Sequence, residues 1–220
     1  MSSIITGTQA KSADTYAIGT LGIPSLTLME TASSKVSDFI CDNFPSASVL
    51  VLSGTGNNGA DGICIARQLM ENVKFTGRIE VIVAGNVEHG SWEFFHQLSE
   101  YKRIKGSLSF HKNRDSLPSA DVLVDAVFGI GLLSQLREDK AALLKLADDM
   151  HYPHVIAVDV PSGINSDTGE LMGAGIHAEH TITFGRNKTG LTAADGKDYA
   201  GEVRVEDIGI PDEAYDHVLS

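Results

Sequence analysis

The sequence predicts an α/β protein whose sheet is mostly parallel and is covered by helices on both faces. Three observations predict this fold. Apolar runs of strand length recur along the chain, helical patterns lie between them, and several runs are followed at once by a glycine or an aspartate. With 220 residues, of which 42% are hydrophobic, the chain has the size and core of one domain.

The chain begins with a helical segment over about residues 9–44. A short polar helix is expected over 9–19, and a second helix starts at Pro24 and Ser25, because proline favours a first helical turn. The second helix carries apolar residues at helical spacing from Leu26 to Ile40.

The rest of the chain, about 47–211, is expected to form the sheet-based core of the same domain, which spans 1–220. Continuous apolar runs predict buried parallel strands, and the patterns between them predict helices. The expected strands are 47–52, 78–84, 121–125 and 154–159, and the expected helices are 63–72, 91–102 and 139–150. Two further strands, 180–184 and 201–205, are expected near a sheet edge.

Charge and composition exclude several classes of protein. The formal net charge of −12 argues against nucleic acid or an anionic membrane surface as the main partner. Cys41 and Cys64 are too few for a disulfide framework and are expected to be free buried thiols. No apolar run reaches the length of a membrane span, and the first residues lack a signal-peptide pattern, so we expect a cytoplasmic protein.

The first candidate loop, residues 53–62, follows the first strand and opens a helix. Gly54, Gly56 and Gly59 fit G-x-G-x-x-G, which permits positive φ and a close backbone approach to a ligand, and the helix N-terminus offers N–H groups to an anion. The second strand does not end in the acid that usually binds a ribose. The loop is therefore a plain turn, an ordinary dinucleotide site or, as we favour, another nucleotide-like site.

Three polar residues make this loop unusual: Asn57, Asn58 and Asp61. Asparagine oxygens bind hard cations, but asparagine also suits turns. Because a carboxylate repels phosphate, Asp61 would bind a sugar hydroxyl or transfer a proton, or else it would cap the helix.

Two more expected strands end in an aspartate. Asp125 could bind a metal, bind a hydroxyl or cap a turn, and Gly129 and Gly131 after it allow backbone N–H groups to face a ligand. Asp159 is followed by Ser162, which lacks the G-x-S-x-G context of a hydrolase nucleophile but offers oxygens to a hard cation. Ligands of open α/β sheets bind at these carboxyl strand ends.

Two basic residues, Arg186 and Lys188, follow the strand 180–184 in a glycine-containing loop. Each is either a phosphate contact or a solvated loop charge. The eight histidines are scattered and form no zinc motif.

Taken together, three of these segments resemble the NAD(P)H-hydrate epimerases, the family of the YjeF N-terminal domain. They are residues 54–62 (GTGNNGADG), 125–132 (DAVFGIGL) and 159–163 (DVPSG). Residues 22–30, 183–191 and 201–211 also follow the family's pattern, so the resemblance covers nearly the whole chain in order.

The resemblance implies a Rossmann-like three-layer sandwich, often a homodimer, with one potassium ion per subunit. It implies an isomerase that interconverts the R and S epimers of hydrated NADH and NADPH, damaged nucleotides with a hydroxyl at C6 of the nicotinamide ring. Since no kinase-like dehydratase domain is found in this sequence, a separate dehydratase is expected to consume the S epimer.

Carried over by motif, the potassium ligands are Asn58, Asp125 and Ser162. The implied substrate-binding residues are Asn57, Asn58, Gly59, Ala60, Asp61, Gly129, Ile130, Gly131, Leu132, Leu133, Ser134, Gln135 and Asp159. Ala60 stands where the family usually has glycine. If that position needs a positive φ the loop must shift, and if it is already helical little changes.

Epimerisation at C6 requires a bond there to break and form again. Either the hydroxyl leaves as water and water returns to the other face, or the ring opens and closes. Asp159 is the first candidate for proton transfer and Asp61 the second, and nearby carboxylates would stabilise a cationic intermediate. The competing hypothesis is a nucleotide-sensing or protein-binding module on the same fold.

Overall fold

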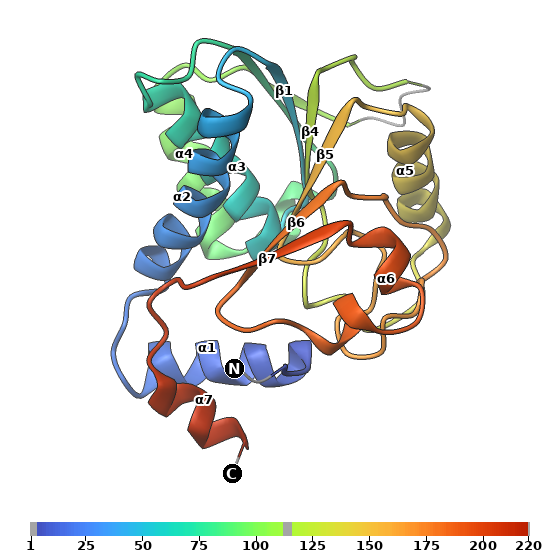
Figure 1. Ribbon diagram of the computed structural model, residues 1–220. Coiled ribbons are helices and arrows are strands. Elements are labelled where there is room, and N and C mark those ends of the chain that lie inside the picture. Colours follow the sequence, from blue (N-terminus) through green and yellow to red (C-terminus); the bar gives the residue numbers. More distant parts are fainter. Residues whose placement is uncertain (1–3, 112–115, 220) are drawn as a thin grey trace.

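The computed structural model describes residues 4–111 and 116–219 (Figure 1). Seven strands of this described part form one parallel sheet in the order β3-β2-β1-β4-β5-β6-β7. They are β1 (Ser48–Ser53), β2 (Arg78–Val83), β3 (Leu108–Phe110), β4 (Val122–Ala126), β5 (His154–Val158), β6 (His180–Phe184) and β7 (Glu202–Glu206). The strand order reverses between β1 and β4, which is the switch point where such sheets bind ligands.

Helices complete a three-layer arrangement, which confirms the predicted fold class. They are α1 (Gly7–Gly19), α2 (Ser25–Asn43), α3 (Asn57–Glu71), α4 (Trp92–Arg103), α5 (Glu138–Asp149), α6 (Gly196–Tyr199) and α7 (Asp212–Leu219), with 3₁₀ turns η1 (Val87–His89) and η2 (Thr189–Thr192). Figure 1 shows α2, α3 and α4 on one side of the sheet and α5 on the other. The helices α1 and α7 pack against each other.

The strand β1 shows why the sequence of each buried strand is a continuous apolar run. Val49 and Val51 belong to the core cluster beneath α2, α3 and α4. Leu50 and Leu52 belong to the cluster beneath α5. Because successive side chains of a strand point to opposite faces and both faces are covered, the four central positions, Val49 to Leu52, are all apolar.

The main differences from the expected elements lie at the ends. The helix expected from residue 63 begins at Asn57, so half of the glycine loop forms the first turns of α3. The strand β3 was not predicted because it has only three residues. The helix α7 lies beyond the expected core boundary at 211, and its Ala214 and Tyr215 pack with the alanines of α1.

Two smaller expectations concern membrane-spanning helices and the two cysteines. Within the described part of the chain, no helix combines the length and apolar character that crossing a bilayer requires. Cys41 and Cys64 are free and buried, as predicted.

Candidate active site

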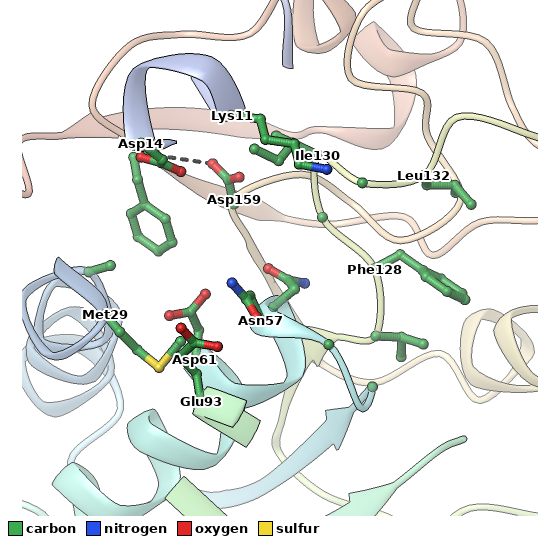
Figure 2. A pocket seen from close by; sticks show the side chains of 18 of the residues that line it. Lys11, Asp14, Met29, Asn57, Asp61, Glu93, Phe128, Ile130, Leu132 and Asp159 are labelled. Carbon is green, nitrogen blue, oxygen red and sulfur yellow. Dashed lines mark hydrogen bonds between the residues drawn. The ribbon is translucent and has the colours of Figure 1, made fainter. Parts of the chain in front are cut away.

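A pocket of about 670 Å³ opens at the carboxyl ends of the strands, between the sheet and α1. Its wall includes Asp14 of α1, Met29 of α2, Asn57, Asn58 and Asp61 of α3, Gly85 after β2, Gly129 after β4, Asp159 after β5 and Phe184 of β6. Figure 2 shows carboxylates of α1, α3, α4 and the loop after β5 facing this space. A pocket therefore lies at the strand ends, where the sequence predicts the site.

The glycine loop owes its shape to close packing. A Cβ on Gly54 would lie 2.2 Å from the carbonyl oxygen of Val127, and a Cβ on Gly59 would lie 2.1 Å from the carbonyl oxygen of Gly54. The loop does not use the positive φ that glycine permits, because the residues with positive φ do not include Gly54, Gly56 or Gly59. Gly56 caps α3 without a side-chain hydrogen bond, so first-turn N–H groups remain for an anion.

The first turns of α3 settle two open questions from the sequence. Ala60 is wholly buried in the helix, and its N–H bonds the Gly56 carbonyl at 2.9 Å, so alanine replaces glycine without a change of backbone. Asp61 lies in the second turn of α3, not at its N-cap, so the capping interpretation is wrong. Its carboxyl group points into the pocket beside Met29 and Glu93 (Figure 2).

Burial and neighbouring carboxylates raise the pKa of two acids in the pocket, Asp61 and Asp14. Burial raises the pKa of Asp61 well above its ordinary value, and the negative charges of Asp159, Asp14 and Glu93 raise it further. Burial and Asp159 raise the pKa of Asp14 to about 6, although Lys188 opposes this. The pocket therefore favours the protonated form of Asp61, whereas Asp14, with a pKa of about 6, is mostly ionised at neutral pH.

Asp159 has a strained backbone and a buried partner. Its φ is +68°, a left-handed conformation that is uncommon outside glycine. Its Oδ1 accepts hydrogen bonds from Lys188 Nζ at 2.5 Å and from Thr183 Oγ1 at 3.0 Å. Phe184 N also donates to Oδ1, at 3.2 Å, and all the hydrogen bonds of this carboxylate within the described residues go to that oxygen. Oδ2 is therefore left for a ligand.

Both interpretations of Lys188 are wrong. Its side chain is only 2% exposed, so it is not a solvated loop charge. Its ammonium donates to Asp159, to Thr183 Oγ1 at 2.9 Å and to the Phe184 carbonyl at 2.7 Å, which uses its three donors and leaves none for phosphate. Arg186 pairs with Asp212 of α7 and lies over the Tyr215 ring, so it too anchors the fold.

A second polar cluster lies behind the pocket wall, at the end of β4. Asp125 is wholly buried, and its carboxylate accepts hydrogen bonds from Ser162 N at 2.7 Å and Ser162 Oγ at 2.5 Å. Burial raises the pKa of Asp125 to about 6, even though the bonds from Ser162 lower it. No lysine or arginine of the described residues forms an ion pair with Asp125.

This cluster suits a hard monovalent cation. Asn58 brings its amide against Gly129, where a Cβ would lie 2.9 Å from Asn58 Oδ1, and Asn58 Nδ2 is buried without a hydrogen-bond partner in the described residues. An uncompensated buried carboxylate, a hydroxyl and the Asn58 amide oxygen form an oxygen-rich donor set. The described residues hold no group of three or more His, Cys, Asp or Glu side chains arranged for a metal, so amide and hydroxyl oxygens would have to contribute.

Comparisons with known proteins decide the family. Residues 25–190 match the family model described as YjeF-related protein N-terminus. The chain belongs to this family. A relative from Limosilactobacillus fermentum, named NAD(P)H-hydrate epimerase, is 42% identical over 205 residues, which cover 92% of this chain and 95% of the relative.

Other similar proteins agree with this assignment. A relative from Leuconostoc mesenteroides with the same name is 38% identical over 216 residues, covering 97% of this chain and 95% of the relative. The crystal structure of the yeast protein ynu0 superposes with a TM-score of 0.74 at 19% identity, covering 93% of this chain and 88% of that one. This last likeness supports the fold.

The substrate residues selected by the YjeF resemblance fall into two groups in the structure. The pocket wall contains Asn57, Asn58, Asp61, Gly129, Ile130, Gly131, Leu132 and Asp159. Gly59 and Ala60 are buried within α3, and Leu133, Ser134 and Gln135 lie outside the wall, with Leu133 60% exposed. Sequence reasoning missed Asp14, because nothing in the residue pattern indicates that α1 crosses the pocket.

Proposed function

We propose that this chain is an isomerase that interconverts the R and S epimers of hydrated NADH and NADPH. The observation that carries the proposal is the pair Asp61 and Asp159, two aspartates in one pocket with opposite environments. Burial and neighbouring acids favour the protonated form of Asp61, whereas Asp159 is paired with a buried ammonium. Such a pair supplies a proton donor and a proton acceptor at the same pH. The curated relatives named NAD(P)H-hydrate epimerase support the same reaction.

The shape of the pocket suggests how the substrate binds. The pyrophosphate lies at the first turn of α3, where N–H groups are free and the helix dipole favours an anion. The damaged nicotinamide ring lies beside Asp14, Asp61 and Asp159, and the negative charges of Asp14 and Asp159 favour a cationic ring. The overall charge of −12 is compatible with this substrate, because the phosphate site is built from backbone.

The reaction proceeds by loss and return of water. Asp61 gives its proton to the C6 hydroxyl, the C–O bond breaks, and the ring nitrogen lone pair forms an iminium bond to C6. A water molecule then attacks C6 from the opposite face, and Oδ2 of Asp159 accepts its proton. Exchange with solvent returns a proton to Asp61 and removes one from Asp159, so atoms and charge balance over the cycle. Proton transfer by placed side chains contributes about 10²–10⁴-fold to such steps.

We also propose that Asn58, Asp125 and Ser162 hold a potassium ion. When bound, the ion supplies positive charge that compensates Asp125 and fixes the loops after β1, β4 and β5 relative to one another. Because potassium is singly charged and a weak Lewis acid, we assign it no chemical step.

Three further expectations belong to this proposal. We expect a homodimer, action in the cytoplasm, and a separate dehydratase that consumes the S epimer. The two free buried cysteines fit a reducing compartment. Light scattering of the purified protein tests the dimer.

The direct test is conversion of the purified R-hydrate of NADH, followed by chromatography that resolves the two epimers. It is run in potassium chloride and in tetramethylammonium chloride. The proposal predicts conversion far above the spontaneous rate, faster in potassium, and lost in Asp61→Asn. The exposed Asp149, changed to Asn, is the control. No acceleration, with an adenine nucleotide still bound, would identify a ligand-sensing module instead.

A further inference from the structure

The end of the pocket farthest from Asp159 contains an unassigned basic group. The pocket wall continues past the glycine loop to Gly85 and Asn86 after β2, and Lys140 of α5 closes it there. In the sheet order, β2 and β5 are separated by β1 and β4. Three interstrand spacings place these strand ends about 14 Å apart. A ligand that reaches both ends must therefore be long, as a dinucleotide is.

Lys140 is an unusual lysine because its side chain is mostly buried, with 20% exposed. Its Nζ lies 3.8 Å from the position that a Cβ on Gly85 would take. Its ion pair is with its neighbour Asp139, at 3.9 Å, and no hydrogen bond from Nζ is formed within the described residues. The ammonium therefore reaches the pocket with most of its donor capacity unused.

Thr55 of the glycine loop adds a second donor at the same place. Its Oγ1 lies 3.2 Å from the Cβ position of Gly85. A side chain on Gly85 would fill this space, which lies between Thr55 and Lys140. The pocket thus ends in a small hollow that is bordered by a hydroxyl and an ammonium.

The charges around this hollow favour an anion. In parallel sheets that bind a dinucleotide on the first glycine loop, the adenosine ribose lies at the end of the second strand, where an acid binds its 2′-hydroxyl. Here Asn86 stands in that place, and its Oδ1 is occupied by the N–H of Glu88. The other charged groups on this side of the wall are Arg137 and Glu93, and Glu93 faces Asp61 rather than Lys140.

We propose that Lys140 and Thr55 bind the 2′-phosphate of the adenosine ribose, so that the enzyme prefers the hydrate of NADPH to that of NADH. A phosphomonoester has the charge and the acceptor oxygens that these two donors lack. This inference rests on the proposed function, because it places the adenosine end of the same substrate.

The test uses calorimetry to measure the binding of two probes, ADP-ribose and 2′-phospho-ADP-ribose, which are the two substrates without the nicotinamide ring. We expect the phosphorylated probe to bind at least about tenfold more tightly, the effect of one charge-assisted hydrogen bond. Lys140→Met should remove this ratio while leaving the affinity for ADP-ribose unchanged. Lys145→Met, an exposed lysine on the same helix, should keep the ratio.

The possible outcomes separate this inference from the proposed function. Equal binding of the two probes, or a ratio that survives Lys140→Met, would overturn the subsite even if the protein epimerises NADH hydrate. Failure of both probes to bind would overturn it too. A ratio that depends on Lys140, found in a protein without epimerase activity, would support the subsite and reject the proposed function.

Discussion

In each of the adjacent strands β4 and β5, an apolar run ends at a buried aspartate, Asp125 or Asp159. The two carboxylates have different hydrogen-bond partners. Asp159 receives a buried ammonium, Lys188 Nζ, at 2.5 Å. Asp125 receives the N–H and hydroxyl of Ser162. The fold therefore gives Asp159 a countercharge from Lys188, whereas no lysine or arginine of the described residues pairs with Asp125. The countercharge that we propose for Asp125 is a cation.

Removal of Lys188, the countercharge that the fold supplies to Asp159, should change stability the most. Lys188→Met leaves Asp159 as an uncompensated buried charge, so we expect unfolding to become easier by about 3–5 kcal/mol. Urea denaturation measures this. The double variant Lys188→Met with Asp159→Asn should recover part of the loss, because both charges are then absent. The exposed Lys197, changed to Met, serves as the control. A Lys188→Met protein as stable as the unmodified one would show that the pair does not matter.

The second prediction tests the proposed potassium ion, which would be the countercharge of Asp125. Saturating potassium should stabilise the unmodified protein by about 2–3 kcal/mol relative to tetramethylammonium at equal ionic strength, the linkage expected near one hundred times Kd. Thermal unfolding of Asp125→Asn should be insensitive to the choice of cation. Without potassium, this variant should be at least as stable as the unmodified protein, because its buried charge is gone. Equal cation responses of the two proteins would contradict the site.

The third and smallest effect concerns proton transfer. The rate should fall as pH rises through the pKa of Asp61, because the protonated form donates. Asp14 is ionised above about pH 6, and its charge helps to raise the pKa of Asp61. Asp14→Asn should therefore move the alkaline limb of the pH–rate profile to lower pH by about half a unit to one unit. An unmoved limb would mean that another group controls it.

Features of the fold and the site could be predicted from the sequence where they depend on residues that are close together in the chain. The buried strands were predicted because both of their faces are covered, which leaves continuous apolar runs. Asp125 and Asp159 stood out because a charge directly after such a run has few structural explanations. These signals are local in the chain.

Other site features depend on contacts between distant residues. Lys188 follows Asp159 by 29 residues, and the pairing requires that β5 and β6 lie side by side. Asp14 reaches the pocket because α1 is fixed by α7 and by hydrogen bonds from Thr8 to Asp167. The hydrophobic pattern of α1 does not distinguish which of its faces meets the pocket, so the sequence could not place Asp14.

The central claim is that Asp61 expels the C6 hydroxyl as water and that Asp159 activates its replacement. The most direct measurement is epimerisation in water enriched in oxygen-18, with mass spectrometry of the separated epimers and a control for spontaneous exchange. In this mechanism, each S molecule formed from the R epimer carries one labelled oxygen. Epimerised product without label would contradict it, because ring opening and closure retain the original oxygen.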